Sequence, residues 1–282
     1  MIVFKHIQPL QIHLAKLKEQ GLTIGFVPTM GALHKGHLSI IQQSLKANDI
    51  TVCSIFVNPT QFNDKADFEK YPITIESDIK QLVSTGCSIL FLPSADEIYP
   101  ADFDQKQNFN LGYLETILEG AYRAGHFQGV AMVVKRLLEI VQPHELFLGR
   151  KDLQQCKVLQ HMVYTEKIPV QITEAPTLRE ASGLAMSSRN QRLTEVDKEK
   201  ATAIYKSIVF IKANLLKLNI DELKRQAAQM LTDAGFDKID YIDIIDSETL
   251  LPVTAYSSNQ KITAIVAAFI GGVRLIDNME LT

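Results

Sequence analysis

The 282-residue sequence contains no tryptophan, only three cysteines and no excess of positive charge. Its 29 Lys and Arg residues are set against 32 Asp and Glu without a dense basic run, so it lacks the basic face that binds a nucleic-acid backbone. The longest late apolar run, at 262–273, is too short for a membrane span, and the N-terminus lacks the apolar stretch of a signal peptide. We therefore expect a cytoplasmic protein with neither nucleic acid nor a membrane as partner.

The cysteines and histidines also exclude some classes of site. Cys53, Cys87 and Cys156 are widely spaced within apolar or helical patterns, which fits neither a disulfide framework nor a metal knuckle. The sequence has seven histidines, but no H-E-x-x-H or C-x-x-C spacing. We expect buried reduced thiols and no metal site built from protein ligands alone.

With 46% apolar and 22% charged residues, the composition is that of a globular protein. Short β-rich apolar runs alternate with helical patterns in the first part of the chain, which predicts an α/β fold with a parallel sheet. The predicted strands lie at 23–27, 50–57, 88–92, 145–148 and 169–173. From about residue 194 the pattern changes to a long helix, a second helix at 221–234 and short strands that include 239–245 and 261–269. We expect a Rossmann-like domain over 1–178 and a smaller α+β domain over 179–282.

The first candidate site follows the first strong strand, where residues 27–41 read VPTMGALHKGHLSII. This pattern indicates a strand, a loop and a helix N-terminus, whose backbone amides and partial positive charge suit a triphosphate. Gly31 and Gly36 permit close approach of the backbone, and His34 and His37 project from one side of the helix. A bare H-x-G-H is a weak signal, but its place at the first βα junction favours nucleotide binding.

Residues 147–155, FLGRKDLQQ, form a second strand-to-helix junction. Lys151 is predicted to start the helix and to meet phosphate as a point charge, with Gln155 on the same face. Asp152 has an alternative role, because an acidic residue in a first helical turn stabilises the helix dipole without any ligand.

Two further segments are polar candidates. In 184–190, LAMSSRN, two hydroxyls and Arg189 can bind phosphate oxygens, although an interdomain linker explains this segment equally well. In 54–62, SIFVNPTQF, a buried strand delivers Gln61 to the carboxyl edge of the sheet, where its amide can bind a small acid or simply face solvent.

The segments PTMGALHKGH, NPTQF, GRKDLQQ and LAMSSRN, in this order, resemble the pantothenate synthetase family over essentially the whole chain. The H-x-G-H pattern also relates the chain to the nucleotidylyltransferase superfamily, in which MSSR stands where class I aminoacyl-tRNA synthetases carry a lysine-serine loop. The resemblance implies that the carboxylate of pantoate attacks the α-phosphorus of ATP and releases pyrophosphate. The amine of β-alanine then displaces AMP to give pantothenate.

The resemblance also implies roles for single residues. His37 would be a proton donor, His34 would lie at the phosphates, and Lys151 would complete the catalytic set. Gln61 and Gln155 would bind pantoate, and Gln61 also β-alanine. The implied ATP-binding residues are Met30, Gly31, Ala32, Leu33, His34, Lys35, Gly36, His37, Gly149, Arg150, Lys151, Asp152, Leu178, Met186, Ser187, Ser188 and Arg189.

The resemblance further implies a homodimer whose C-terminal domain closes over the nucleotide site, and magnesium bound with the ATP phosphates. Asp78 and Gln81 are candidate magnesium ligands, although a solvated helix face is the better interpretation of these two residues. Two rival functions remain. A nucleotidylyltransferase would keep the nucleotide in its product, whereas a noncatalytic nucleotide-binding domain would turn nothing over, so release of AMP distinguishes both from the ligase.

Overall fold

The computed structural model describes residues 1–63, 65–104 and 107–282, which form two compact units. Unit 1 comprises residues 1–150 and 154–176, and unit 2 comprises residues 151–153 and 177–282. Each unit has a hydrophobic core of its own. In the part of the chain that is described, no helix is both long and apolar enough to cross a membrane.

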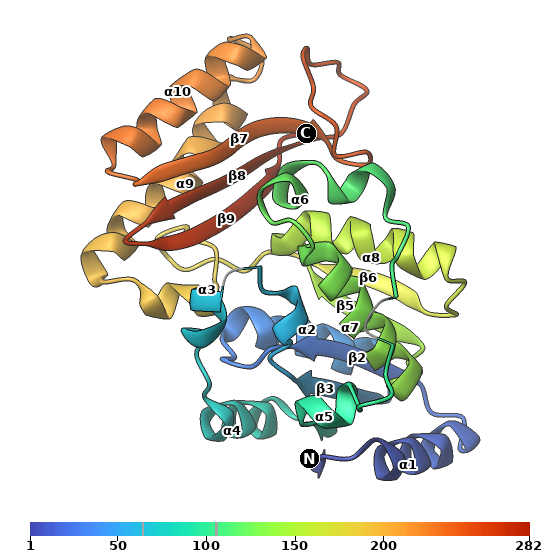
Figure 1. The fold of residues 1–282 in the computed structure, drawn as a ribbon. Coiled ribbons are helices and arrows are strands. Elements are labelled where there is room, and N and C mark those ends of the chain that lie inside the picture. Colours follow the sequence, from blue (N-terminus) through green and yellow to red (C-terminus); the bar gives the residue numbers. More distant parts are fainter. Residues whose placement is uncertain (64, 105–106) are drawn as a thin grey trace. The chain divides into compact units, whose positions relative to one another are not determined.

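A parallel sheet forms the centre of unit 1 (Figure 1). Among the described residues it contains β1 (Ile2–Phe4), β2 (Ile24–Thr29), β3 (Ile50–Ile55), β4 (Ile89–Phe91), β5 (Glu145–Gly149) and β6 (Gln171–Ala175). The strand order is β1-β4-β3-β2-β5-β6, and every pairing is parallel. The predicted α/β class is therefore confirmed, and β1 is an additional edge strand that the sequence pattern did not predict.

Helices surround this sheet. The longer ones are α1 (Ile7–Glu19), α2 (Lys35–Ala47), α4 (Ile75–Thr85), α7 (His126–Val141) and α8 (Leu153–Thr165), and the short ones are α3 (Lys65–Glu69), α5 (Ala95–Ile98) and α6 (Leu118–Tyr122). Single 3₁₀ turns occur at η1 (Pro59–Gln61), η2 (Gly112–Glu115) and η3 (Arg150–Asp152). Helix α2 packs on β2, β3 and β5 and against α4, and apolar residues such as Ile41, Leu82 and Phe147 fill this layer.

The strand order reverses at β2, which has β3 on one side and β5 on the other. In open α/β sheets, ligands bind outside the carboxyl ends of the strands at such a switch point. The loop after β2 begins at Met30 and leads into α2, and the turn after β5 begins at Arg150. The topology therefore brings the first two predicted segments to the edge where a nucleotide site is expected.

Unit 2 is an α+β structure with an antiparallel sheet. It contains the turn η4 (Ser188–Arg192), the helices α9 (Glu195–Asn214) and α10 (Ile220–Asp233), and the strands β7 (Lys238–Asp246), β8 (Ile262–Ile270) and β9 (Val273–Glu280). Both helices pack on one side of the β7-β8-β9 sheet (Figure 1), where Ile204, Leu223 and Val266 lie in the core. Gly271 and Gly272, both with positive φ, form the tight hairpin turn between β8 and β9.

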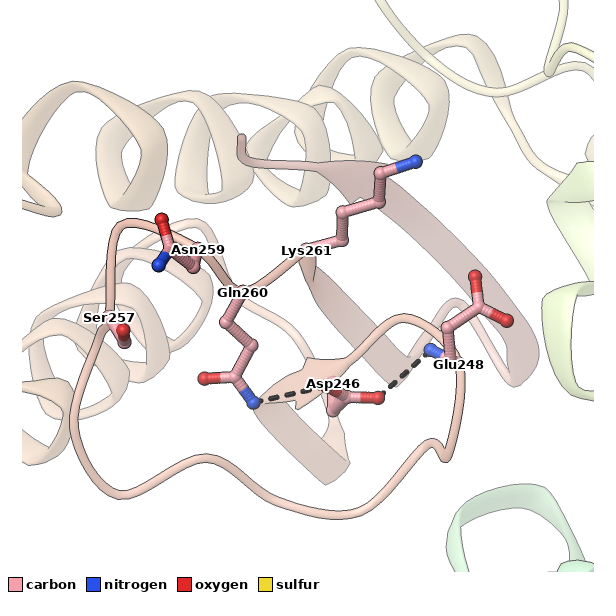
Figure 2. Close-up of a pocket in the computed structure, with 6 residues that line it drawn as sticks. All are labelled: Asp246, Glu248, Ser257, Asn259, Gln260 and Lys261. Carbon is pink, nitrogen blue, oxygen red and sulfur yellow. Dashed lines mark hydrogen bonds between the residues drawn. The ribbon is translucent and has the colours of Figure 1, made fainter.

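Asp246 stabilises the connection from β7 to β8. Its carboxylate accepts hydrogen bonds from the backbone amide of Glu248 and the side-chain amide of Gln260, both at 3.0 Å (Figure 2). It also accepts one from the backbone amide of Thr249, at 2.8 Å. These hydrogen bonds, led by that of the Thr249 amide, lower the pKa of Asp246 to about 2. The carboxylate therefore links the start of this connection, at Glu248 and Thr249, to its end at Gln260.

Candidate functional site

The loop between β2 and α2 has an unusual backbone. Gly31 and Ala32 both have positive φ, at 79° and 49°, a conformation that costs a non-glycine residue free energy. Hydrogen bonds from two directions hold it. The Gly31 amide donates to the Thr29 hydroxyl at 3.2 Å, and the amides of Ala32 and Leu33 donate to the two carboxylate oxygens of Asp78, at 3.0 and 2.8 Å. Protein groups on two sides therefore hold the backbone of this loop.

Asp78 is fully buried on α4, so the interpretation of its helix face as solvated is wrong. Besides the two amides, its carboxylate accepts a hydrogen bond from the Thr74 hydroxyl at 3.0 Å. Gln81, one turn further on, donates its side-chain amide to the Leu33 carbonyl at 3.2 Å. Both side chains thus support the loop at Leu33, and the Asp78 oxygens are engaged by backbone amides rather than turned toward a metal ion.

His34 and His37 lie together at the N-terminus of α2. Their ring centroids are 4.0 Å apart, which confirms the expected common side of the helix. His34 is the N-cap residue, and its Nδ1 accepts a hydrogen bond from the Gly36 amide at 3.1 Å. Because Nδ1 accepts, the proton of the neutral ring is on Nε2. The pair therefore combines two imidazoles with the positive end of a helix dipole.

Gln61 lies against the β2–α2 loop. Its side-chain nitrogen donates to the Met30 sulfur at 2.8 Å, and its side-chain oxygen accepts from the amide of Asn58 at 3.2 Å. Asn58 is itself almost completely buried, donates to the Gly129 carbonyl at 3.2 Å and accepts from the Tyr99 hydroxyl at 2.9 Å. The Gln61 amide is therefore oriented by its neighbours, rather than being merely solvated.

The backbone of Gln61 is held by α7. His126 Nδ1 lies 2.7 Å from the Gln61 carbonyl and must donate, because a carbonyl oxygen only accepts. Its other ring nitrogen, Nε2, is 3.0 Å from the guanidinium of Arg123. Helix and turn pack so closely that a Cβ on Gly129 would lie 2.3 Å from the Thr60 carbonyl oxygen. The sequence pattern identified none of these supporting residues, because the partners of Asn58 and His126 lie 71 and 65 positions away in the sequence.

Gln154 and Gln155, adjacent on the first turn of α8, have different environments. Gln154 is buried: its oxygen accepts from the Glu119 amide at 2.9 Å, and its nitrogen donates to the carbonyls of Leu114 and Ile117, at 2.7 and 2.9 Å. Gln155, the predicted pantoate ligand, is half-buried. Gln154 therefore has a structural role in unit 1 that the sequence pattern did not indicate.

The β5–α8 junction departs in detail from its prediction. Lys151 lies in the turn η3 rather than in the first turn of the helix, because α8 begins at Leu153. The Arg150 guanidinium is 3.9 Å from the carboxylate of Glu174 on the neighbouring strand β6. The Lys151 ammonium is 3.6 Å from the carboxylate of Asp152, and its side chain is only 17% exposed. Asp152 thus pairs with the cation that is predicted to bind phosphate.

In unit 2, the predicted residues Leu178 and Met186 close a short hairpin. The Met186 amide donates to the Leu178 carbonyl at 3.0 Å, and an antiparallel bridge pairs Arg179 with Ala185. Ser187 then caps η4 by accepting from the Arg189 amide at 3.3 Å. The MSSR residues therefore lie on a structured turn that directly follows a hairpin.

Nothing in the described ranges forms a group of three or more His, Cys, Asp or Glu side chains suited to a metal ion. A magnesium ion that accompanies ATP needs only one or two carboxylates besides the phosphates. Asp78 does not fit that role, because two backbone amides and a hydroxyl already bond its oxygens. We therefore assign no protein ligand to magnesium.

Comparison with known proteins shows the family of the chain. The family model for pantoate-beta-alanine ligase matches residues 2–280. A relative from Cytophaga hutchinsonii, named pantothenate synthetase, is 43% identical over 283 residues, which cover 100% of this chain and 99% of the relative.

Solved structures give the same result. A pantothenate synthetase from Thermus thermophilus is 36% identical and covers 100% of this chain and 99% of its own, with a TM-score of 0.92. A pantoate-beta-alanine ligase from Francisella tularensis, complexed with beta-gamma ATP and beta-alanine, is 38% identical, with a TM-score of 0.82 and coverage of 100% and 98%. The chain belongs to the pantoate-beta-alanine ligase family.

Proposed function

We propose that this protein joins pantoate to β-alanine at the expense of ATP, through a pantoyl-adenylate, and releases pyrophosphate and AMP. The contact between Gln61 and Met30 is the observation that carries this function. It places an oriented neutral amide 2.8 Å from the loop that leads into the two histidines. A group suited to a small acid thus lies beside a group suited to a triphosphate, as adenylation of a carboxylate requires.

ATP, as its magnesium complex, is the first substrate. The relative from Francisella tularensis, which is described with beta-gamma ATP and beta-alanine, supports the assignment of ATP as a substrate. The amides of Ala32, Leu33 and Gly36 already have partners inside unit 1, so the imidazoles and the α2 dipole are the groups proposed to meet the phosphates there. Lys151 and the segment 186–189 are also proposed to bind ATP, as the sequence resemblance implies, and the domain boundary at 178–179 is proposed on the same ground.

In the first step, a carboxylate oxygen of pantoate attacks the α-phosphorus and pyrophosphate leaves. Such a displacement depends on in-line positioning and on neutralising the charge that develops on the leaving group. Lys151, Arg189 and His34 would neutralise that charge, and His37 would donate a proton to the leaving group. Gln61 and Gln155 would orient pantoate, because a neutral amide holds a carboxylate without the tight ion pair that weakens it as a nucleophile.

In the second step, the amine of β-alanine attacks the acyl carbon of the adenylate, and AMP departs with both electrons of the broken acyl–oxygen bond. The amine must lose a proton as the amide bond forms. Gln61 is proposed to bind β-alanine as well, as the sequence resemblance implies, and the side-chain amide of Asn58 orients it. The homodimer and the cytoplasmic location are proposed on family resemblance and on the requirement for ATP.

The test is to incubate the protein with ATP, magnesium, pantoate and β-alanine and to quantify the products. Equal amounts of pantothenate, AMP and pyrophosphate are expected. A product that retains the nucleotide would identify a nucleotidylyltransferase instead. ATP binding without turnover would identify a noncatalytic nucleotide-binding protein.

A further inference from the structure

Strand β9 carries two polar residues side by side where apolar residues are expected. Asp277 and Asn278 are only 3% and 5% exposed. Successive residues of a strand point to opposite faces of its sheet. Asp277 pairs in register with Val266, which faces the α9–α10 layer, and Asn278 pairs with Ile265 on the other face. Because buried polar groups are costly without partners, each residue needs a specific contact on its own side.

Asp277 binds Arg179 through a two-pronged ion pair. The guanidinium nitrogens lie 2.5 and 3.0 Å from the two carboxylate oxygens, and the guanidinium carbon lies 4.9 Å from the ring centre of Tyr205 on α9. Arg179 also donates to the carbonyls of Gly183 and Asn278, at 3.2 and 3.0 Å. The paired geometry of guanidinium and carboxylate fixes orientation as well as distance. Arg179 is therefore fixed against both β9 and α9.

This ion pair fixes the hairpin that ends in the MSSR segment. Arg179 pairs with Ala185 across the hairpin, and the side-chain amide of Asn190, directly after MSSR, donates to the Ala185 carbonyl at 3.0 Å. Gly183 has a φ of 90°, and a Cβ there would lie 2.1 Å from the Tyr205 ring. The hairpin thus packs tightly on α9. The ion pair of Arg179 and the hydrogen bond from Asn190 hold the end of the hairpin near Met186.

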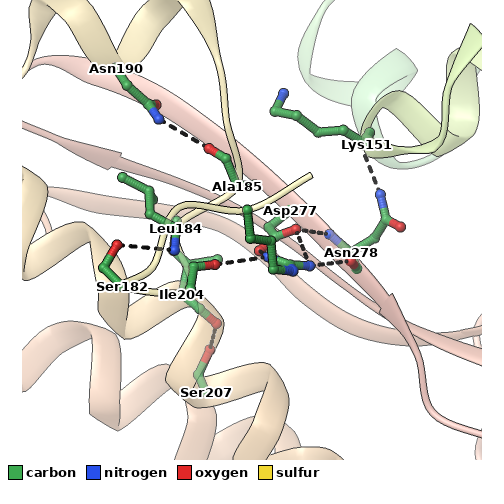
Figure 3. Close-up of polar contacts among 11 residues, drawn as sticks. Lys151, Ser182, Leu184, Ala185, Asn190, Ile204, Ser207, Asp277 and Asn278 are labelled. Carbon is green, nitrogen blue, oxygen red and sulfur yellow. Dashed lines mark hydrogen bonds and ion pairs between the residues drawn. The ribbon is translucent and has the colours of Figure 1, made fainter. Parts of the chain in front are cut away.

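Asn278 makes the contact on the opposite face. Its side-chain amide donates to the backbone carbonyl of Lys151 at 2.8 Å (Figure 3). This hydrogen bond joins residues that are 127 positions apart in the sequence and belong to the same compact unit. One strand therefore holds the turn that bears Lys151 through Asn278, and the hairpin that leads to Arg189 through Asp277.

We propose that Asp277 and Asn278, the β9 anchor, are positioning residues that set the placement of Lys151 relative to the segment 186–189, so that both segments reach one triphosphate. The inference rests on the proposed function, because it takes Lys151 and Arg189 to be groups that bind ATP. Both anchor residues are proposed to act through the segments that they hold, by way of Arg179 and the Lys151 carbonyl. A displacement of about 1 Å at such a group can lower a rate on the order of 100-fold.

The direct test measures exchange of labelled pyrophosphate into ATP with pantoate, magnesium and the Asn278→Ala variant. We expect kcat/KM for ATP to fall about 10- to 100-fold, with the KM for pantoate unchanged. The matched control is Ile265→Val, which alters the cross-strand neighbour on the same face. It should leave kcat/KM for ATP unchanged, because it removes no hydrogen bond to Lys151.

A double-mutant cycle separates positioning from a general loss of structure. In the Lys151→Ala background, Asn278→Ala should cost about twofold or less, because its effect passes through Lys151. Equal losses in both backgrounds would overturn the anchor. If Asn278→Ala does not fold, Arg179→Lys tests the other side of β9. Lysine keeps the positive charge but cannot donate the two parallel hydrogen bonds that the guanidinium donates to Asp277. The loss in Arg179→Lys should shrink to about twofold or less in the Arg189→Ala background, and an unchanged loss would overturn the anchor.

The same measurements distinguish a failure of the proposed ATP-binding role of Lys151 from a failure of the β9 anchor. If Lys151→Ala exchanges pyrophosphate as fast as the unmodified protein, the proposed role of Lys151 in ATP binding fails. If Lys151→Ala is impaired and Asn278→Ala is not, the ATP proposal survives and the β9 anchor is rejected.

Discussion

Asp78 holds Leu33: its Oδ1 lies 2.8 Å from the Leu33 backbone nitrogen, and its Oδ2 lies 3.0 Å from the nitrogen of Ala32, the preceding residue. A buried carboxylate beneath a loop proposed for ATP is unexpected, because like charges repel. The two amides and the Thr74 hydroxyl offset the cost of burying it. In return, the carboxylate holds a loop backbone with two successive positive φ angles.

We expect Asp78→Ala to lower the free energy of unfolding by about 3 kcal/mol, because it leaves two buried amides unpaired. Asp78→Asn should fall between this variant and the unmodified protein, since it keeps one acceptor and turns an amide toward the other N–H. Both variants should bind ATP more weakly. Urea unfolding and calorimetry measure the two effects.

Magnesium-free conditions make the test of Asp78 specific. A loop support is needed without any metal ion, so the loss of stability should be present in EDTA. Glu76→Gln, which removes an exposed charge from the same helix, should change neither quantity. If Asp78→Ala were fully stable in EDTA and weakened ATP binding only with magnesium present, Asp78 would be a metal ligand after all.

Lys151→Ala should remove about 2 to 4 kcal/mol of transition-state stabilisation from the adenylation step, as loss of one electrostatic donor does. Folding should change little, because the carboxylate that lies 3.6 Å from the ammonium, that of Asp152, is 46% exposed, and such ion pairs contribute little to stability. Single-turnover release of pyrophosphate measures the rate of this step, and Lys46→Ala, at an exposed position on α2, is the control. A variant that melts early but whose folded fraction turns over normally would make Lys151 a structural residue.

Gln154 and Gln155 provide a matched pair for separating structure from substrate binding. Gln155→Ala should cost about 1 to 3 kcal/mol in kcat/KM for pantoate, while stability and calorimetric ATP affinity stay unchanged. Gln154→Ala should instead destabilise unit 1 by a similar amount, because the Glu119 amide loses its acceptor and the carbonyls of Leu114 and Ile117 lose their donor. If Gln155→Ala weakened ATP binding and left pantoate saturation unaltered, Gln155 would belong to the nucleotide site.

Asp246 should make unit 2 sensitive to acid. Because hydrogen bonds lower its pKa to about 2, its contribution to stability is complete above the ordinary value of 3.8 and is lost as the pH falls toward 2. Asp246→Asn should therefore be less stable than the unmodified protein at pH 6, by on the order of 1 kcal/mol, and nearly equal to it at pH 2. Urea unfolding at both pH values measures this difference, and a gap that stayed constant with pH would contradict the assignment.

The parallel sheet was predictable because strands buried on both faces appear as continuous apolar runs. β2, β3 and β5 occur close to their predicted positions for this reason. β1 was missed because it has only three residues, and Ile2 and Val3 are largely exposed. Its place in the sheet depends on pairing with β4, 87 residues away, which no local pattern contains.

The supporting residues of the site were not predictable in the same way. Asp78 stands in a polar stretch of α4 that resembles a solvated helix face, and its burial results from a loop 45 residues away. Gln154 and Gln155 are chemically identical, so only the three-dimensional structure shows that the side-chain oxygen and nitrogen of Gln154 both make hydrogen bonds within unit 1. The role of Asn278 likewise depends on its hydrogen bond to the carbonyl of Lys151, 127 residues earlier, which no local pattern contains.

Exchange of labelled pyrophosphate into ATP, with pantoate and magnesium present and β-alanine absent, tests the central claim most directly. Adenylation is reversible and does not involve the amine, so label should enter ATP, and the rate should depend on pantoate and fall strongly in Lys151→Ala. Exchange that requires β-alanine, or that proceeds without pantoate, would contradict a pantoyl-adenylate formed in a separate first step.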